Sequence, residues 1–79
     1  MRALFARTKI EKFPEPIMGE VEQAIASNQP GRVKCLGTTW PARFYQPEIR
    51  KTIMPTEPVS IIAICGITML VVPVENIGQ

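Results

Sequence analysis

The residues of this sequence that could do chemistry are four potential nucleophiles, Ser27, Cys35, Ser60 and Cys65. A serine or cysteine nucleophile needs a neighbouring base, most often a histidine that is itself oriented by a carboxylate. The chain contains no histidine and no aspartate, and its glutamates and lysines form no recognisable catalytic motif. We therefore expect a protein that is not an enzyme and that has no catalytic residues.

The two cysteines, Cys35 and Cys65, are also the candidate metal ligands of the chain. A structural zinc site takes four cysteine or histidine ligands as a rule, so this pair alone does not complete one. Residues 1–13 lack the apolar core of a secretory signal peptide. We therefore expect a cytoplasmic protein with free thiols and with no metal or other cofactor.

The most apolar part of the chain is VSIIAICGITMLVV at 59–72, which contains no charged residue and is bounded by prolines. A helix that spans a bilayer takes about 20 apolar residues, so this segment is too short. Most of its residues are β-branched, which favours strands, and Gly66 near its centre can supply the positive φ of a hairpin turn. The sequence predicts two antiparallel strands, 59–64 and 67–72, joined by a Cys-Gly turn, and no transmembrane segment.

The preceding part of the chain also has the pattern of short strands. Three strands are predicted at 19–27, 32–36 and 40–45, with turns at 28–31 and 37–39. A long irregular connection follows at 46–58, and eight prolines oppose long helices. Five short strands with no internal helix must bury their apolar face against each other, so we predict an all-β fold, a small five-stranded barrel. A β-sandwich is the alternative.

Basic character is concentrated at the N-terminus. Residues 1–13 hold four basic side chains and one acidic side chain, whereas the remainder of the chain, here called the body, holds five basic and six acidic ones. Apolar residues recur in this segment at three- and four-residue steps, at Ala3, Ala6, Ile10 and Phe13. This spacing indicates a short amphipathic helix that could lie on the barrel, on a second copy or on a membrane surface. A flexible arm is the alternative, and we divide the chain into an N-terminal arm at 1–18 and a barrel at 19–79.

Several short motifs occur in a defined order between residues 19 and 74. They comprise Pro30, Gly31 and Val33, then Gly37, Trp40 and Ala42, and finally Val59, Ile61, Ile64, Gly66, Met69, Val71 and Pro73. In this order and spacing they resemble the C-terminal soluble domain of NfeD-like proteins. The resemblance implies a five-stranded OB-type barrel and a module that binds membrane-scaffold proteins of the stomatin, prohibitin and flotillin kind.

The last predicted strand offers a candidate interaction site. If Ile67, Met69 and Val71 fill the barrel, alternation along the strand places the intervening side chains outside. Together with the preceding strand, this gives an apolar outer row at Ile62, Leu70 and Val72. Exposed apolar rows mark contacts with other chains, so we expect a scaffold-protein partner or a second copy to bind there. Coverage of the row by apolar residues of the N-terminal arm is the alternative.

An alternative function for an OB-type barrel is the binding of single-stranded nucleic acid. Such barrels use aromatic side chains on which bases stack and basic side chains that contact phosphates. The chain offers a set of this kind in Trp40, Phe44, Tyr45, Arg32, Lys34 and Arg43. The near-neutral charge of the body weighs against this function, because nucleic-acid surfaces are clustered basic faces. Burial statistics also favour a place in the core for Trp40.

Overall fold

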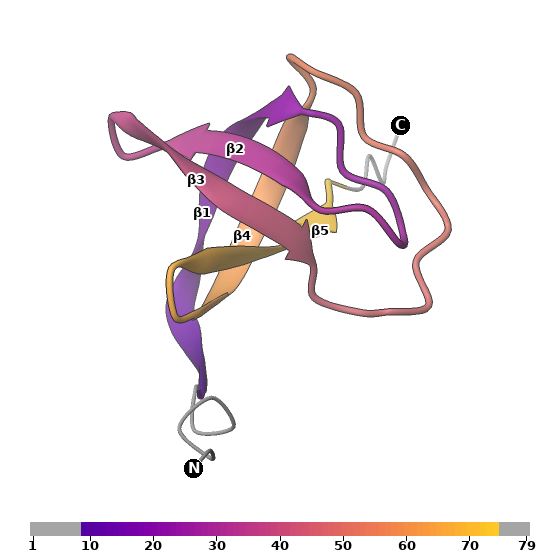
Figure 1. Ribbon diagram of the computed structural model, residues 1–79. Helices are drawn as coiled ribbons and strands as arrows, with labels where there is room; N and C mark the ends of the chain where they lie inside the picture. The colour runs from indigo at the N-terminus through magenta and orange to yellow at the C-terminus, as the bar shows by residue number, and fades with distance from the viewer. Residues whose placement is uncertain (1–8, 75–79) are drawn as a thin grey trace, which may run out of the picture.

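The computed structural model describes residues 9–74, which form five β-strands and no helix (Figure 1). The strands are β1 (Ile10–Gln23), β2 (Gly31–Cys35), β3 (Thr38–Phe44), β4 (Pro58–Cys65) and β5 (Thr68–Pro73). They close into a barrel in the order β1-β2-β3-β5-β4, with β3 and β5 parallel and the other neighbours antiparallel. The fold is therefore an all-β, five-stranded OB-type barrel, as predicted. Residues 9–74 contain no helix that could cross a membrane.

The first strand differs most from the prediction. It begins at Ile10 rather than at Gly19, so part of the segment predicted to be an arm belongs to the sheet. β1 pairs with β4 from Ile10 to Glu20, with Lys12 opposite Ala63, and its last residues pair with β2, with Val21 opposite Val33. The predicted helix is wrong from Ile10 onward, because the backbone there is extended and pairs with β4. Residues 1–8 of the predicted arm lie outside the described residues.

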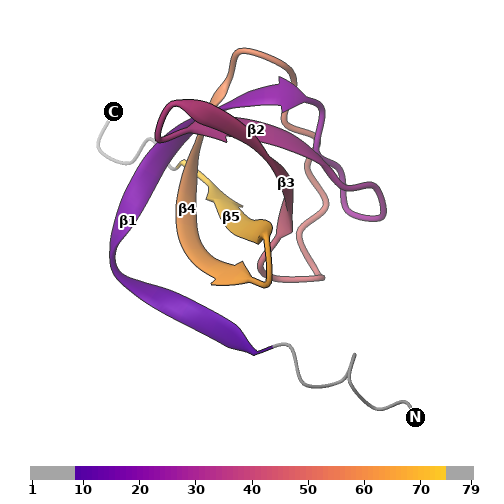
Figure 2. The same ribbon diagram turned by 60° about the vertical axis from the view of Figure 1, so that its left-hand side comes forward.

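The two prolines in β1 explain why its early part did not resemble a strand. Pro14 and Pro16 have no backbone N–H to donate to a neighbouring strand. The pairing of β1 with β4 shifts register between Lys12 and Ile17, so both prolines lie in an irregular stretch where no ladder bond is required. Figure 2 shows the sharp bend that β1 makes along its length. Bulges and strand edges are the places where a sheet accepts proline.

Both tight turns are displaced by one residue from the predicted positions. The turn between β2 and β3 is Leu36–Gly37, and both residues have positive φ, at 52° and 81°, as in a type I′ hairpin turn. The turn between β4 and β5 is Gly66–Ile67, with a φ of 68° at Gly66. Leu36 and Ile67 are therefore turn residues rather than the end and the start of strands.

The barrel interior is filled mainly by aliphatic side chains, and burial alternates most clearly along β2 and β4. The buried core cluster is Val21, Ile25, Val33, Cys35, Ala42, Phe44, Ile53, Val59, Ile61, Met69 and Val71. The long connection between β3 and β4 contributes to this core, because Ile53 exchanges two backbone hydrogen bonds with Ile25, at 2.9 and 3.0 Å. A further bond from the Val21 N–H to the Glu57 carbonyl, at 2.9 Å, ties the end of the connection to β1.

Two glycines allow the packing and the turn chemistry to be tested separately. A Cβ at Gly31 would collide with the backbone carbonyl oxygens of Gln23 and Ala24, whereas one at Gly37 would meet nothing within 4 Å. We expect Gly31→Ala to lower the free energy of unfolding by about 3 kcal/mol, because backbone must move. Gly37→Ala should lower it by about 1 kcal/mol, through its positive φ alone. Urea denaturation measures both, and equal losses would contradict the packing at Gly31.

Candidate functional site

The three residues of the predicted interaction row lie on the outer face of β4 and β5. Met69 and Val71 belong to the buried core cluster, so alternation directs the side chains of Leu70 and Val72 outward. On β4, the register with β5 shifts between Ile61 and Ala63, which makes Ile62 the extra residue of a bulge. The structure therefore brings Ile62, Leu70 and Val72 to one face of one sheet.

Leu70 is nevertheless fully buried, which corrects the prediction that the whole row is exposed. It lies between Ala63 of β4 and Arg43 of β3 in the ladder, and it is not part of the interior cluster. Leu70 and Ala63 thus form a buried apolar pair on the outer side of the sheet, which we call the covered base. Ile67 was predicted to point inward and is instead 66% exposed, because it is a turn residue.

Val72 is half-buried and belongs to a cross-strand row with a more exposed neighbour. Ser60 of β4 lies opposite Val72 on one side and opposite Met18 of β1 on the other. Met18 is 59% exposed. Beside this row is a shallow hollow of about 520 Å³, lined by Gln46, Ile49, Lys51, Val72 and Pro73. We call the combined surface of Met18, Ile62 and Val72 the outer apolar face.

A cation–π contact between Lys12 and Tyr45 lies at one side of this face. The Lys12 ammonium lies 5.4 Å from the centroid of the Tyr45 ring. Tyr45 follows β3 directly, and its backbone N–H donates to the Val71 carbonyl at 2.9 Å, so its position is fixed by the sheet. Lys12 shares a ladder row with Ala63 and, through it, with Leu70. The contact therefore joins the early part of β1 to the end of β3 across the covered base.

The residues predicted for base stacking are not assembled into one platform. Trp40 lies opposite Val33, a fully buried core residue, and the Trp40 Nε1–H donates to the Cys35 carbonyl at 3.4 Å. Phe44 is buried in the core, and Tyr45 is half-buried beneath Lys12. Trp40 thus occupies the inner face of β3, as burial statistics indicated.

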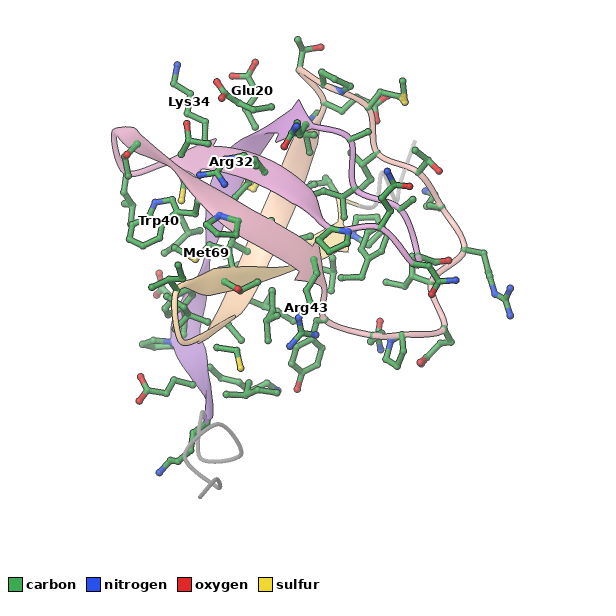
Figure 3. All side chains as sticks on the ribbon, in the orientation of Figure 1. Glu20, Arg32, Lys34, Trp40, Arg43 and Met69 are labelled. Atoms are coloured by element: carbon green, nitrogen blue, oxygen red, sulfur yellow. The ribbon has the colours of Figure 1, made fainter. Side chains whose placement is uncertain are left out.

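The basic residues of β2 lie on the opposite face of the sheet from Trp40. Arg32 and Lys34 alternate with buried neighbours and are exposed on the outer face. Glu20 of β1 lies opposite Lys34, as Figure 3 shows, and the Thr39 hydroxyl donates to the Glu22 carboxylate at 3.3 Å. The outer face of β1, β2 and β3 therefore carries both signs of charge. The other three predicted residues, Arg43, Phe44 and Tyr45, line a separate hollow of about 290 Å³ together with residues 26–30 and Pro47.

Cys35 and Cys65 are free thiols in different environments. Burial raises the pKa of Cys35, because the interior of the barrel disfavours the thiolate. Cys65 is half-buried at the end of β4, opposite Ile10. A thiol whose pKa is raised by burial is a poor nucleophile, so Cys35 is a core residue.

In comparisons with family models, with curated proteins and with solved structures, nothing matched this chain. Sequence reasoning missed the exposed side chains of Met18 and Leu36, which lie in the corrected part of β1 and in the corrected turn. The pattern of alternation would have placed Met18 outside had β1 been extended to Ile10.

Leu70 and Val72 have different burial on the same strand, which predicts different responses to a charge. Leu70→Lys should lower the free energy of unfolding by about 4 kcal/mol, because the ammonium would be buried without a partner. Val72→Lys should cost less than about 1 kcal/mol, because a long side chain can extend from a half-buried site into water. Thermal and urea unfolding of both variants tests this. A Leu70→Lys variant as stable as the parent would show that Leu70 is not covered.

Proposed function

We propose that this chain is a non-enzymatic protein-interaction module that binds its partner through the outer apolar face. The partner is a membrane-scaffold protein of the stomatin, prohibitin or flotillin type, or a second copy of this chain. The observation that carries the proposal is the row from Met18 to Val72, which lies beside a hollow on an otherwise closed barrel. The resemblance of the chain to the NfeD-like C-terminal domain supports the choice of partner, and we infer a cytoplasmic location at a membrane surface.

The outer apolar face has the composition of a small interaction surface. Interface cores are depleted in charge and enriched in methionine and aliphatic groups, with polar residues around them. Met18, Ile62 and Val72 fit the apolar centre, and the hollow beside Val72 can accept one side chain of a partner. The buried pair of Ala63 and Leu70 lies beside this surface on the same side of the sheet.

The charges around the face favour a partner with an acidic rim. Lys12 and Arg43 share the ladder row of the covered base, and Lys51 lines the hollow. Among the described residues 9–74, no acidic side chain lines that hollow. Rim charges of one sign steer an oppositely charged partner and set the salt dependence of association. The interaction should therefore weaken as ionic strength rises.

Sedimentation velocity tests the proposal with the full chain alone and mixed with purified stomatin-, prohibitin- and flotillin-type domains. We expect a complex in at least one of these samples for the parent protein. Val72→Lys and Met18→Lys should each weaken it by at least about tenfold, because a charge enters an apolar contact.

Met54→Lys is the matched control, because Met54 is 52% exposed but lies on the long connection outside this face. It should leave the complex unchanged. The proposal is wrong if none of the samples forms a complex, or if Met54→Lys weakens it as much as Val72→Lys does.

A further inference from the structure

One end of the barrel carries both tight turns. Because β3 and β5 run parallel, their first residues lie at the same end, and so do the turns that precede them, Leu36–Gly37 and Gly66–Ile67. The start of β1 lies there too, since Ile10 is opposite Cys65. Figure 1 shows the two turns on the left of the barrel, with the connection between β3 and β4 on the right. We call this region the turn end.

The turn end exposes large aliphatic side chains where hairpin turns usually carry small or polar ones. Leu36 is 70% exposed and Ile67 is 66% exposed, each at the tip of its turn. Ile10 is 51% exposed in the strand beside the second turn. Single exposed aliphatic residues are ordinary on protein surfaces, but here both turns at the same end carry one.

Leu36 is also held in an unfavourable backbone conformation. Its φ of 52° is in the left-handed region, which glycine, asparagine and aspartate adopt far more readily than leucine. The turn extends away from the rest of the fold, since a Cβ on the adjacent Gly37 would have no neighbour within 4 Å. Neither backbone preference nor packing accounts for leucine at this position. Backbone strain of this kind is concentrated at functional sites such as ligand clamps.

The charges at the turn end are mixed and nearly balanced. Lys9 and Lys12 lie on either side of Ile10, and Lys34 lies just before the first turn. The acidic residues there are Glu11, Glu20, which is opposite Lys34, and Glu22, which accepts a hydrogen bond from Thr39. Lysine side chains beside exposed aliphatic tips are typical of surfaces that bind anionic lipid headgroups.

We propose that the turn end docks on the surface of a lipid bilayer, with Leu36 and Ile67 inserted at the headgroup boundary. A fluid bilayer can accept two separate aliphatic tips, whereas a protein interface needs a continuous, shape-matched surface. Lys9 and Lys34 lie beside the aliphatic tips and favour anionic headgroups, and Ile10 adds apolar contact beside the second tip. This function uses Leu36 and Ile67, which are not part of the outer apolar face. The module could therefore bind a membrane and a protein partner at the same time.

Cosedimentation with lipid vesicles tests this proposal on the full chain. The probes are vesicles of phosphatidylcholine alone and of phosphatidylcholine mixed with phosphatidylglycerol. We expect the parent to bind the mixed vesicles, and more weakly the neutral ones. Leu36→Asn and Ile67→Asn should each reduce the partition coefficient by about tenfold, because each removes one aliphatic side chain from the apolar contact.

The stability of Leu36→Asn separates docking from folding. Asparagine accepts a positive φ more readily than leucine, so this variant should unfold at the same temperature as the parent or at a higher one. A structural role for Leu36 would instead lower stability and binding together. Met54→Asn is the control, since it removes an exposed aliphatic residue from the connection at the other end.

Three results would overturn the proposal. The first is an absence of binding to the mixed vesicles. The second is binding that survives both Leu36→Asn and Ile67→Asn, which would place the lipid contact elsewhere in the chain. The third is a Met54→Asn variant that loses as much binding as the turn-end variants do.

Discussion

The pairing of one long strand with two partners is the constraint on which the barrel depends. β1 pairs with β4 over most of its length and with β2 at its end, while β3 and β5 pair in parallel on the other side. This arrangement closes the sheet, and closure satisfies the backbone groups that an open sheet would expose at its edges. It also makes a single interior, in which Val21 of β1 contacts a core that includes residues of all the strands.

Closure also decides which surfaces remain for function. Once the interior is filled by alternating aliphatic residues, the remaining side chains of each strand point outward by necessity. On β4 and β5 several of these outward residues are apolar, among them Ile62 and Val72, with Ser60 opposite Val72. The parallel pairing of β3 and β5 places both turns at one end and the long connection at the other. The outer apolar face and the turn end thus both follow from the strand topology of the barrel.

Much of the fold could be predicted from the residues. The turn signals and β-branched runs indicated five strands, and alternation correctly placed Met69 and Val71 in the core. The exact turn positions were not predictable, because glycine can occupy either turn position. It is the second turn residue at Gly37 and the first at Gly66, so the neighbouring Leu36 and Ile67 were assigned to strands.

The remaining differences from the sequence-based predictions concern features that depend on contacts between strands distant in the sequence. Prolines in β1 resemble strand breakers in a sequence, yet Pro14 and Pro16 lie in the stretch where the register with β4 shifts. The outward direction of Leu70 follows from alternation, but its burial depends on neighbours in other strands. The predicted stacking residues are divided between different surfaces for the same reason. Alternation separates Trp40 from Arg32 and Lys34 by directing them to opposite faces of the sheet.

Nuclear Overhauser effects across the β1–β4 ladder test the central claim, that β1 closes the barrel, most directly. The structure predicts cross-strand effects between the backbone protons of Lys12 and Ala63 and between those of Met18 and Ser60. Amide protons in the β1–β4 and β1–β2 ladders should also exchange slowly, because they are hydrogen-bonded within the sheet. A helical pattern of effects around Ile10 to Phe13, with none to β4, would contradict the closed barrel.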